Sequence, residues 1–292
     1  MNILVTGGAG FIGSNLVDKL SLEHNIIVID NLSTGNLNNI NSKCKFYCQD
    51  IRDNLDNIFM QQKIDVIFHL AAFINLRDSI TNPKLCFDIN VQGSINLIDY
   101  AKKYNIKKII FSSTGGAIYS EFEKLPWNEN ALAEPKSPYG LSKLVIEQYL
   151  EMSGINYSIL RYSNVYGPKQ NSKGEAGVIS IFIDKIKNKE TLNVFGSGNQ
   201  TRDFVYVDDV VQSNILCLNN CDKQVLNVST NTETSVNDLI KLLNYNNVNY
   251  LNAIGQEVEK TKLDNIKLMS FGWKPTINIC DGLKLTSDWF NK

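Results

Sequence analysis

The sequence has no long apolar run and almost no net charge, and these absences exclude several classes of protein. No apolar stretch reaches the about 18 residues that a membrane-spanning helix needs, and the N-terminus enters a strand-like segment without a signal-peptide core. The net charge of -1 comes from lysines interspersed with acids, so it gives no general attraction to nucleic acid or to acidic membranes. We therefore expect a cytoplasmic protein that binds neither.

The chain is also poor in the residues that hold metals. It contains only His24 and His69, and its six cysteines form no C-x-x-C pair. We expect no metal site and interpret the cysteines as buried free thiols. The 292 residues, 43% hydrophobic and 20% charged, suit one large domain or two intimately joined ones.

Glycine, by contrast, is dense at the start of the chain. The segment Asn2–Thr6 has the length and branched side chains of a buried parallel strand, and residues 11–22 carry apolar side chains at helical spacing. The glycines between them fit two patterns: Gly8, Gly10 and Gly13, or Gly7, Gly10 and Gly13. Either pattern lets the backbone approach a pyrophosphate and aims the N–H groups of a helix N-terminus at it. The alternative is a flexible turn.

An acid at the end of the second strand supports the dinucleotide interpretation. Asp30 closes the predicted strand 24–30, about 20 residues after the glycines, where a carboxylate binds the ribose 2′-hydroxyl. The same carboxylate repels a 2′-phosphate, and no Lys or Arg lies between Asp30 and Lys43 to compensate that charge. We therefore expect NAD rather than NADP as the cofactor. Arg52, the first arginine of the chain, is interpreted as a solvated surface charge.

Strand-like and helix-like segments alternate through the first half of the chain. After residue 30, strands are expected at 45–48, 66–70, 108–113 and 157–160, and the clearest helices at 83–104 and 139–153. This order is typical of an α/β fold with a doubly wound parallel sheet, a Rossmann domain with helices on both faces. We expect that domain to span residues 1–165. Later loop signals predict a smaller C-terminal α/β substrate-binding lobe over 166–292, from which 203–219 returns to the first domain.

A tyrosine and a lysine stand one turn apart in the predicted helix 139–153. Tyr139 and Lys143 therefore share a face of that helix. An ammonium near a phenol favours the phenolate, so such a tyrosine can accept or donate a proton. A solvated pair is the alternative, but Ser137 and Pro138 start the helix, and a buried strand upstream ends in the hydroxyls of 112–114. Ligands bind at such carboxyl ends of strands.

Further motifs follow in order along essentially the whole chain. They are TGGAGFIG (6–13), DNLSTG (30–35), HLAA (69–72), NVQG (90–93), FSSTGGAIY (111–119), SPYGLSK (137–143), LRYSNVYGP (160–168), GSGNQTRDFVYVDDVV (196–211) and FGWKP (271–275). With this set the chain resembles the extended short-chain dehydrogenases/reductases of the NAD-dependent epimerase/dehydratase family, and it is most similar to the nucleotide-sugar 4-epimerases.

The resemblance implies a role for each matching position. Tyr139 would be the acid and base, Lys143 would bind the nicotinamide ribose and tune Tyr139, and Thr114 or its neighbour Ser113 would bond the reacting hydroxyl. The implied cofactor-binding residues are Gly7, Gly10, Phe11, Ile12, Gly13, Asp30, Asn31, Ser33, Thr34, Gly35, Asp50, Ile51, Leu70, Ala71, Ala72, Ser112, Tyr139 and Lys143. The implied substrate-binding residues are Thr114, Asn164, Val178 and Arg202. A loop turn at Asn164 and a surface ion pair of Arg202 with Asp203 are the alternatives.

The resemblance also implies the reaction. A 4-epimerase oxidises a nucleotide-sugar to a transient 4-keto intermediate and reduces it on the opposite face, so NAD stays bound. Related dehydratases carry an Asp-Glu pair after the active-site threonine, and decarboxylases carry an acid in the same loop, whereas Gly115 and Gly116 stand here. Another nucleotide-sugar enzyme, such as a reductase, and a non-catalytic NAD-binding sensor are the alternatives. Retention of Tyr139 and Lys143 favours an enzyme.

Two positions depart from the family pattern. Ile254 stands where an arginine usually pairs with the diphosphate, which leaves Arg202, with Lys260 or Lys262, as candidate phosphate ligands. Thr261 stands where a bulky residue is associated with excluding N-acetylated sugars, so such sugars could be admitted. The resemblance implies a UDP-hexose or UDP-N-acetylhexosamine as substrate. It also implies a homodimer in which the long helices 83–104 and 139–153 of both subunits pair.

Overall fold

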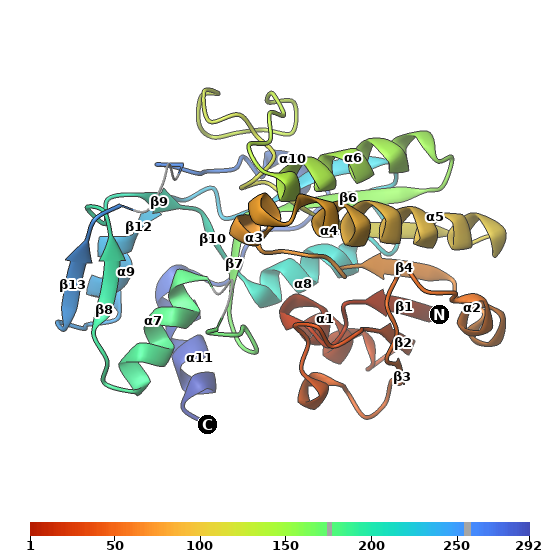
Figure 1. Ribbon diagram of the computed structural model, residues 1–292, viewed down its shortest axis with the longest axis horizontal. Coiled ribbons are helices and arrows are strands. Elements are labelled where there is room, and N and C mark those ends of the chain that lie inside the picture. The colour runs from red at the N-terminus through yellow and green to blue at the C-terminus, as the bar shows by residue number, and fades with distance from the viewer. Residues whose placement is uncertain (174–176, 254–257) are drawn as a thin grey trace.

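A parallel sheet is the largest feature of the computed structural model, which describes residues 1–173, 177–253 and 258–292 (Figure 1). Its strand order is β11-β6-β5-β4-β1-β2-β3. The strands are β1 (Asn2–Thr6), β2 (Asn25–Ile29), β3 (Lys45–Tyr47), β4 (Val66–His69), β5 (Lys108–Thr114), β6 (Tyr157–Tyr162) and β11 (Gln224–Val228). The order runs outward in both directions from β1, so the doubly wound sheet expected from the sequence is confirmed.

Helices connect these strands and continue into the C-terminal part of the chain. The helical segments are α1 (Phe11–Leu20), the short 3-10 helix η1 (Leu37–Asn39), α2 (Asp56–Gln62), α3 (Leu76–Thr81), α4 (Pro83–Phe87), the π-helix η2 (Asp88–Gln92), α5 (Gly93–Lys103), α6 (Pro138–Met152), α7 (Val178–Lys187), α8 (Val207–Leu216), α9 (Val236–Leu242), α10 (Ile266–Met269) and α11 (Ile279–Phe290). Within the described residues, no helix is both long and apolar enough to cross a membrane.

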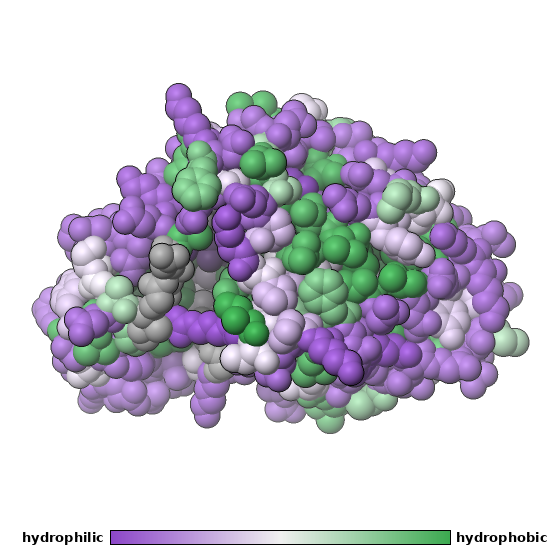
Figure 2. All heavy atoms as spheres, turned by 45° about the horizontal axis from the view of Figure 1, so that its top comes forward, coloured by the Kyte–Doolittle hydropathy of each residue, from purple (hydrophilic) through white to green (hydrophobic). Residues whose placement is uncertain are grey.

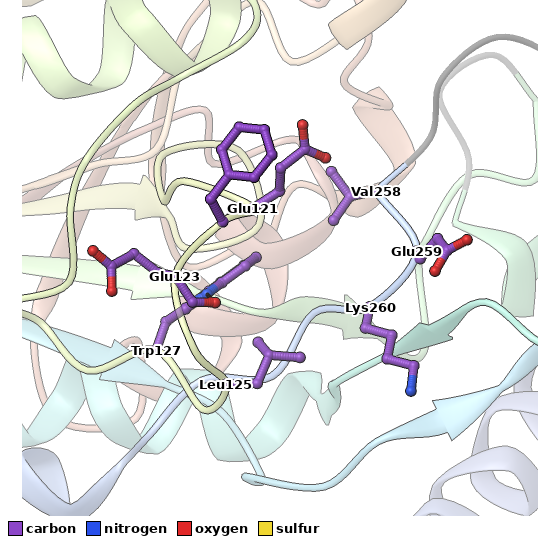
Figure 3. A pocket seen from close by; sticks show the side chains of 8 residues that line it. Glu121, Glu123, Leu125, Trp127, Val258, Glu259 and Lys260 are labelled. Carbon is purple, nitrogen blue, oxygen red and sulfur yellow. Dashed lines mark hydrogen bonds between the residues drawn. The ribbon is translucent and has the colours of Figure 1, made fainter.

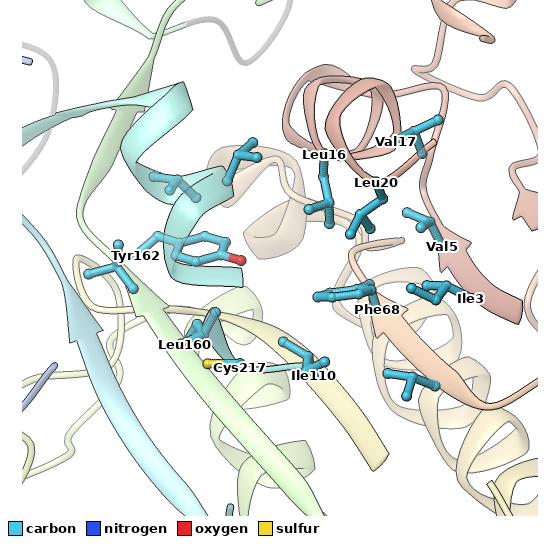
Figure 4. Close-up of a cluster of buried hydrophobic side chains, with 14 of the residues drawn as sticks. Ile3, Val5, Leu16, Val17, Leu20, Phe68, Ile110, Leu160, Tyr162 and Cys217 are labelled. Atoms are coloured by element: carbon cyan, nitrogen blue, oxygen red, sulfur yellow. The ribbon is translucent and has the colours of Figure 1, made fainter. Parts of the chain in front are cut away.

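The two faces of the sheet are covered by different helices. Alternate residues of a strand point to opposite faces, so Ile3 and Val5 of β1 pack with α1 and α8 in the cluster that Figure 4 shows. Leu4 packs on the other face with side chains of α2, α5 and α6. Because both faces are buried, the strands need apolar side chains throughout, which explains their continuous apolar sequences.

The predicted helix over 83–104 differs in one respect, because a π-helix interrupts it. Segment η2 separates α4 from α5, and its residue Asn90 is 3% exposed. The side-chain amide of Asn90 donates to the carbonyl oxygen of Phe73 at 3.0 Å and to the hydroxyl of Ser142 at 2.9 Å. These contacts connect the widened turn with α6 and with the chain that follows β4.

The remaining strands form small sheets in the C-terminal half. They are β7 (Asn164–Tyr166), β8 (Leu192–Phe195), β9 (Thr201–Arg202), β10 (Phe204–Tyr206), β12 (Thr234–Ser235) and β13 (Val248–Leu251). Strand β8 pairs with β13 in parallel, β7 with β10 in parallel, and β9 with β12 antiparallel. Helices α7, α9 and α11 lie beside these strands, on the left in Figure 1.

Two segments of the C-terminal half pack on the large sheet. Helix α8 lies against α1, within the 203–219 segment that the sequence predicts to return. Strand β11 extends the sheet beyond β6, with Leu226 opposite Leu160. The first lobe therefore draws a strand as well as a helix from the later part of the chain.

Candidate active site

The turn between β1 and α1 can form only with glycines. Gly7 has a φ of +73°, and its carbonyl oxygen accepts a hydrogen bond from the N–H of Gly10 at 3.1 Å. A Cβ on Gly13 would lie 2.1 Å from that same oxygen, so the helix approaches the turn only because this position has no side chain. The pattern that shapes the turn is therefore Gly7, Gly10 and Gly13, whereas Gly8 packs against Val28.

Helix α1 begins directly after this turn, and its N-terminus suits an anion. Gly10 is the capping residue and supplies no side chain. The N–H groups of Phe11 and Ile12 have no acceptor within the helix, because the first turn precedes any intrahelical partner. The partial positive charge at this end of the helix favours a pyrophosphate.

Asp30 lies at the carboxyl end of the neighbouring strand β2. It is 7% exposed, and its carboxylate accepts hydrogen bonds from the N–H groups of Ala9 (3.0 Å) and Leu32 (2.8 Å). A Cβ on Gly35 would lie 2.8 Å from Oδ1 of Asp30, so the loop 30–35 closes tightly around the acid. The carboxylate is thus held beside the glycine turn, as ribose binding requires. The exposed side chains of this loop include Asn31, Ser33 and Thr34.

Asp50 follows β3 and is held by an arginine. The guanidinium of Arg52 donates to the Asp50 carboxylate at 2.8 and 2.9 Å and to Asp88 at 2.5 Å. The hydrogen bonds from Arg52 lower the pKa of Asp50 to about 2. Arg52 is exposed, as its interpretation as a surface charge requires, but it also forms ion pairs with both acids. The adjacent Ile51 is buried against Gly93.

The chain after β4 passes close to the glycine turn. Leu70, Ala71 and Ala72 are half-buried there, and a Cβ on Gly7 would lie 2.7 Å from the backbone nitrogen of Ala71. The small alanines leave room for a ligand over the strand ends. Together with the free end of α1 and the fixed Asp30, this surface fits the pyrophosphate and ribose of a dinucleotide.

Tyr139 stands in the first turn of α6, and the loop after β5 fixes the position of that turn. The hydroxyl of Ser137 caps the helix by accepting a hydrogen bond from the N–H of Gly140 at 3.1 Å. A Cβ on Gly140 would lie 2.1 Å from the carbonyl oxygen of Ala117, so loop and helix are in direct contact. Tyr139 is half-buried at this junction.

Lys143 extends from the next turn of α6 toward β5. It is 4% exposed; its ammonium donates to the carbonyl oxygen of Ser112 at 2.8 Å and lies 4.8 Å from the centre of the Phe111 ring. Burial lowers the pKa of Lys143 to about 8, although the nearby carboxylate of Glu147 opposes that shift. The lysine is therefore positioned on the strand from which the candidate hydroxyls project.

The two candidate hydroxyls face opposite sides of β5, because successive strand residues alternate. The Ser113 hydroxyl donates to the carboxylate of Glu147, and Ser113 is 4% exposed. Thr114 ends the strand and is half-exposed, and within the described chain no hydrogen bond occupies its hydroxyl. Of the two, Thr114 is the one whose hydroxyl remains available to a ligand.

A buried ion pair behind the site is a feature that the sequence analysis missed. Nη2 of Arg161, on β6, lies 2.6 Å from Oε2 of Glu147, and both residues are buried. Nη1 of Arg161 donates to the hydroxyl of Tyr119 at 2.9 Å. The available signal was spacing: Glu147 stands four residues after Lys143 and so shares its helix face.

Apart from Thr114, the predicted substrate residues come from separate segments of the second half. Asn164 is exposed at the start of β7, and its N–H donates at 2.9 Å to the carbonyl oxygen of Asp203, the neighbour of Arg202. The surface ion pair with Arg202 is contradicted, because Asp203 is fully buried and its carboxylate accepts from Thr230 at 2.9 Å. Burial raises the pKa of Asp203 to about 6. Val178 is half-buried at the start of α7.

Arg202 lies beside the segment that carries the other candidate phosphate ligands. Its guanidinium donates to the carbonyl oxygens of Thr201 at 2.8 Å and Glu259 at 3.5 Å, and Lys260 forms a β-bridge with Thr201. Glu259 and Lys260 also line a cavity of about 500 Å³ beneath the loop 121–127. Figure 3 shows the Lys260 amine directed away from the acids of that loop.

The remaining positions that the sequence analysis names near the diphosphate and the sugar are Ile254, Lys262 and Thr261. Ile254 lies outside the described residues. Lys262 accepts a hydrogen bond from the N–H of Trp127 at 2.9 Å through its carbonyl oxygen. Thr261 is 5% exposed, and its N–H donates to the carbonyl oxygen of Thr201 at 3.2 Å.

Comparisons with known proteins agree with this geometry. A family model described as the NAD dependent epimerase/dehydratase family matches residues 3–229. A provisionally named UDP-glucose 4-epimerase of Methanocaldococcus jannaschii is 49% identical over 98% of this chain and 97% of its own. The crystal structure of Thermotoga maritima UDP-glucose 4-epimerase with UDP-glucose has a TM-score of 0.97 and 43% identity over 100% and 99% of the two chains. Methanobrevibacter ruminantium UDP-N-acetylglucosamine 4-epimerase, complexed with UDP-N-acetylmuramic acid, has a TM-score of 0.94 and 33% identity over 99% and 98%.

We expect the buried ammonium of Lys143 to lower the free energy of unfolding of the wild-type protein. Lys143→Met raises the free energy of unfolding at pH 7 by about 2–3 kcal/mol, because the folded pKa of about 8 lies below the ordinary value of 10.5. Between pH 8 and pH 10.5 the unfolded chain holds a proton on Lys143 that the folded chain has lost. The unfolding free energy of the wild type therefore rises with pH over this range, and its difference from that of Lys143→Met shrinks. Urea unfolding of nucleotide-free protein from pH 7 to 10 measures both effects.

Lys19→Met, at an exposed lysine of α1, is the matched control and leaves the pH dependence unchanged. Equal unfolding free energies for wild type and Lys143→Met at both ends of the pH range would contradict the predicted cost.

Proposed function

The chain belongs to the NAD dependent epimerase/dehydratase family, and from that premise we propose that it catalyses the NAD-dependent 4-epimerisation of a nucleotide-sugar. The reaction proposed first interconverts UDP-glucose and UDP-galactose. The observation that carries the proposal is the placement of Tyr139, Lys143 and Thr114 around the carboxyl end of β5, next to a surface that fits NAD. The similar proteins named for 4-epimerase activity support the same choice.

Three side chains take part in the proposed reaction. Tyr139 removes the proton of the sugar 4-hydroxyl and returns it when the epimer forms. The ammonium of Lys143 favours the phenolate of Tyr139 and binds the nicotinamide ribose. The hydroxyl of Thr114 bonds the 4-oxygen and orients it. When bound, NAD supplies the acceptor and donor of the hydride at C4.

The loop after Thr114 favours epimerisation over dehydration. Elimination of water needs a further acid and base, and the dehydratase relatives carry them directly after the threonine. Here the position is Gly115, where a Cβ would lie 2.3 Å from Cδ1 of the buried Leu263. An acidic side chain at this position would displace part of the core, so the site supports proton and hydride transfer alone.

A UDP-N-acetylhexosamine is the second candidate substrate. Thr261 is a small residue at the position associated with excluding such sugars, and a structural neighbour is named a UDP-N-acetylglucosamine 4-epimerase. A panel of UDP-hexoses and UDP-N-acetylhexosamines, with 4-epimers resolved by chromatography, separates the two candidates.

Two measurements distinguish the proposed epimerase from the other classes of protein. The NAD content after purification separates an epimerase from a reductase with an exchangeable cofactor, and turnover separates either enzyme from a sensor.

We further propose a division of the chain into two lobes. Residues 1–165, with 203–219, bind NAD, and 166–292 bind the substrate. The position of Arg202 beyond the end of β6 supports this division. We propose a cytoplasmic location, which the free state of the cysteines supports, because thiols stay reduced in that compartment.

We also propose that the protein is a homodimer formed through α4, η2, α5 and α6. Leu85 of α4 is 44% exposed and Leu141 of α6 is 43% exposed, so this face carries apolar side chains that the monomer does not bury. Figure 2 shows hydrophobic side chains gathered on one face of the molecule. Pairing the two helical segments with those of a second copy would cover them in a four-helix bundle.

Tyr139→Phe abolishes epimerisation, because the ring remains and the proton acceptor is lost. NAD binding stays largely intact, since the variant leaves the glycine turn and Asp30 unchanged. Both properties are measured on one preparation, by product analysis and by bound nucleotide per chain. Near-native epimerisation by the variant would refute the assignment of Tyr139.

Arg202→Ala raises KM for the nucleotide-sugar by about ten- to a hundredfold, because a charge-assisted bond to phosphate contributes about 1.5–3 kcal/mol. NAD affinity barely changes. Steady-state kinetics on Arg202→Ala, Lys260→Ala and Lys262→Ala compare the candidate ligands. An unchanged KM in Arg202→Ala, with a raised KM in a lysine variant, would show that the lysine holds the diphosphate instead.

Leu141→Glu converts the proposed dimer to monomer at micromolar concentration, because it places a charge in an apolar interface. Light scattering measures the mass. Leu242→Glu is the matched control, since Leu242 of α9 is equally exposed, at 43%, and lies outside the proposed interface. A wild-type protein that is monomeric and fully active would contradict the dimer.

A further inference from the structure

Glu147 contacts the site from behind, through two strands. Its carboxylate accepts a hydrogen bond from the Ser113 hydroxyl of β5 and bonds from Arg161 of β6, at 3.1 Å from Nε and 2.6 Å from Nη2. Ser113 stands between Ser112, whose carbonyl oxygen accepts the hydrogen bond from Lys143, and Thr114, the candidate hydroxyl. A displacement of Glu147 would therefore move α6 relative to the part of β5 where Lys143 and Thr114 meet.

Arg161 is itself held in place, so the carboxylate has a fixed partner. Its Nη1 donates to the hydroxyl of Tyr119 at 2.9 Å, and its guanidinium lies 5.0 Å from the centre of the Tyr119 ring. The Tyr119 hydroxyl donates in turn to the side-chain oxygen of Asn227 at 2.7 Å. The chain of contacts runs from α6 through β6 to β11 and leaves Glu147 little freedom to turn away.

The groups that face Lys143 differ in charge. They are the Phe111 ring and the Ser112 carbonyl of β5, the Cys86 thiol of α4, the His69 ring of β4, and Glu147 of α6 itself. Burial lowers the pKa of His69 to about 3 and raises the pKa of Cys86, so both are uncharged near pH 7. Glu147 is the anion in this set.

We propose that Glu147 is a positioning residue for the reaction: it fixes helix α6 on strand β5 through Ser113, and its carboxylate keeps Lys143 in the ammonium form beside Tyr139. Its role in the reaction rests on the proposed function, whereas its effect on Lys143 does not. Arg161 pairs with the carboxylate from the neighbouring strand β6, whereas Lys143 lies one turn away from Glu147 on the same helix. An apolar side chain could fill the space of Glu147, so packing alone does not explain a buried acid at this position.

The test is to titrate Lys143 directly in the protein as purified. Protein labelled with ¹³C at the lysine ε-carbons gives an NMR signal for Lys143, assigned by its loss in Lys143→Met. The wild-type midpoint is expected below 10.5, the ordinary pKa of lysine, because the side chain is buried. In Glu147→Gln the side chain keeps its shape and loses its charge, so the midpoint falls by about one pH unit. The alkaline limb of the kcat profile moves down by the same amount.

The matched control is Glu151→Gln, which changes an exposed glutamate one turn further along α6 and leaves both the midpoint and the profile unchanged. If Glu147→Gln does not fold, the double variant Glu147→Gln, Arg161→Met removes the carboxylate without leaving a lone buried charge, and it lowers the midpoint too. A wild-type midpoint in either folded variant would overturn the proposal. A lowered midpoint without any epimerase activity in the wild type would instead overturn the proposed function alone.

Discussion

The placement of helix α6 on strand β5 is the constraint on which the rest of the site depends. Lys143 reaches the carbonyl oxygen of Ser112 at 2.8 Å, and Gly140 touches the carbonyl of Ala117, at a distance that allows no side chain. These contacts fix the same helix at successive turns. A shift along the helix by one residue would break both contacts, so this register fixes where the candidate residues of α6 lie relative to β5.

The contact between α6 and β5 includes buried charged side chains. An ammonium and an ion pair lie where a protein core usually places apolar side chains, and burial disfavours the charged form of Lys143. The buried carboxylate of Asp209, by comparison, accepts hydrogen bonds from Thr276 and Ile277. The charge of Lys143 instead has a carbonyl oxygen and a ring as its nearest partners, which leaves it able to respond to a ligand.

The sequence was sufficient for the fold and for much of the site, because both depend on local patterns. Strands β1 and β5 and helix α6 agree with their predictions to within one residue at each end, since apolar periodicity and the Ser-Pro helix start are local signals. The ion pair of Glu147 with Arg161 could not be predicted, because only the packing of α6 on the sheet brings these two residues together. For Arg52, the bond to Asp50 joins residues two apart in the sequence, and only the bond to Asp88 depends on the fold. The bond of the Ser113 hydroxyl to Glu147, on the face of β5 opposite to Thr114, could not be predicted for the same reason.

The central claim is that hydrogen leaves C4 of the sugar and returns to C4 of the same molecule. The most direct test is to incubate the purified protein with UDP-galactose that carries deuterium at C4 and to analyse the UDP-glucose formed by NMR and mass spectrometry. The account predicts that the product retains deuterium at C4, because the hydride stays on a bound cofactor throughout the cycle. A product with protium at C4 would contradict it.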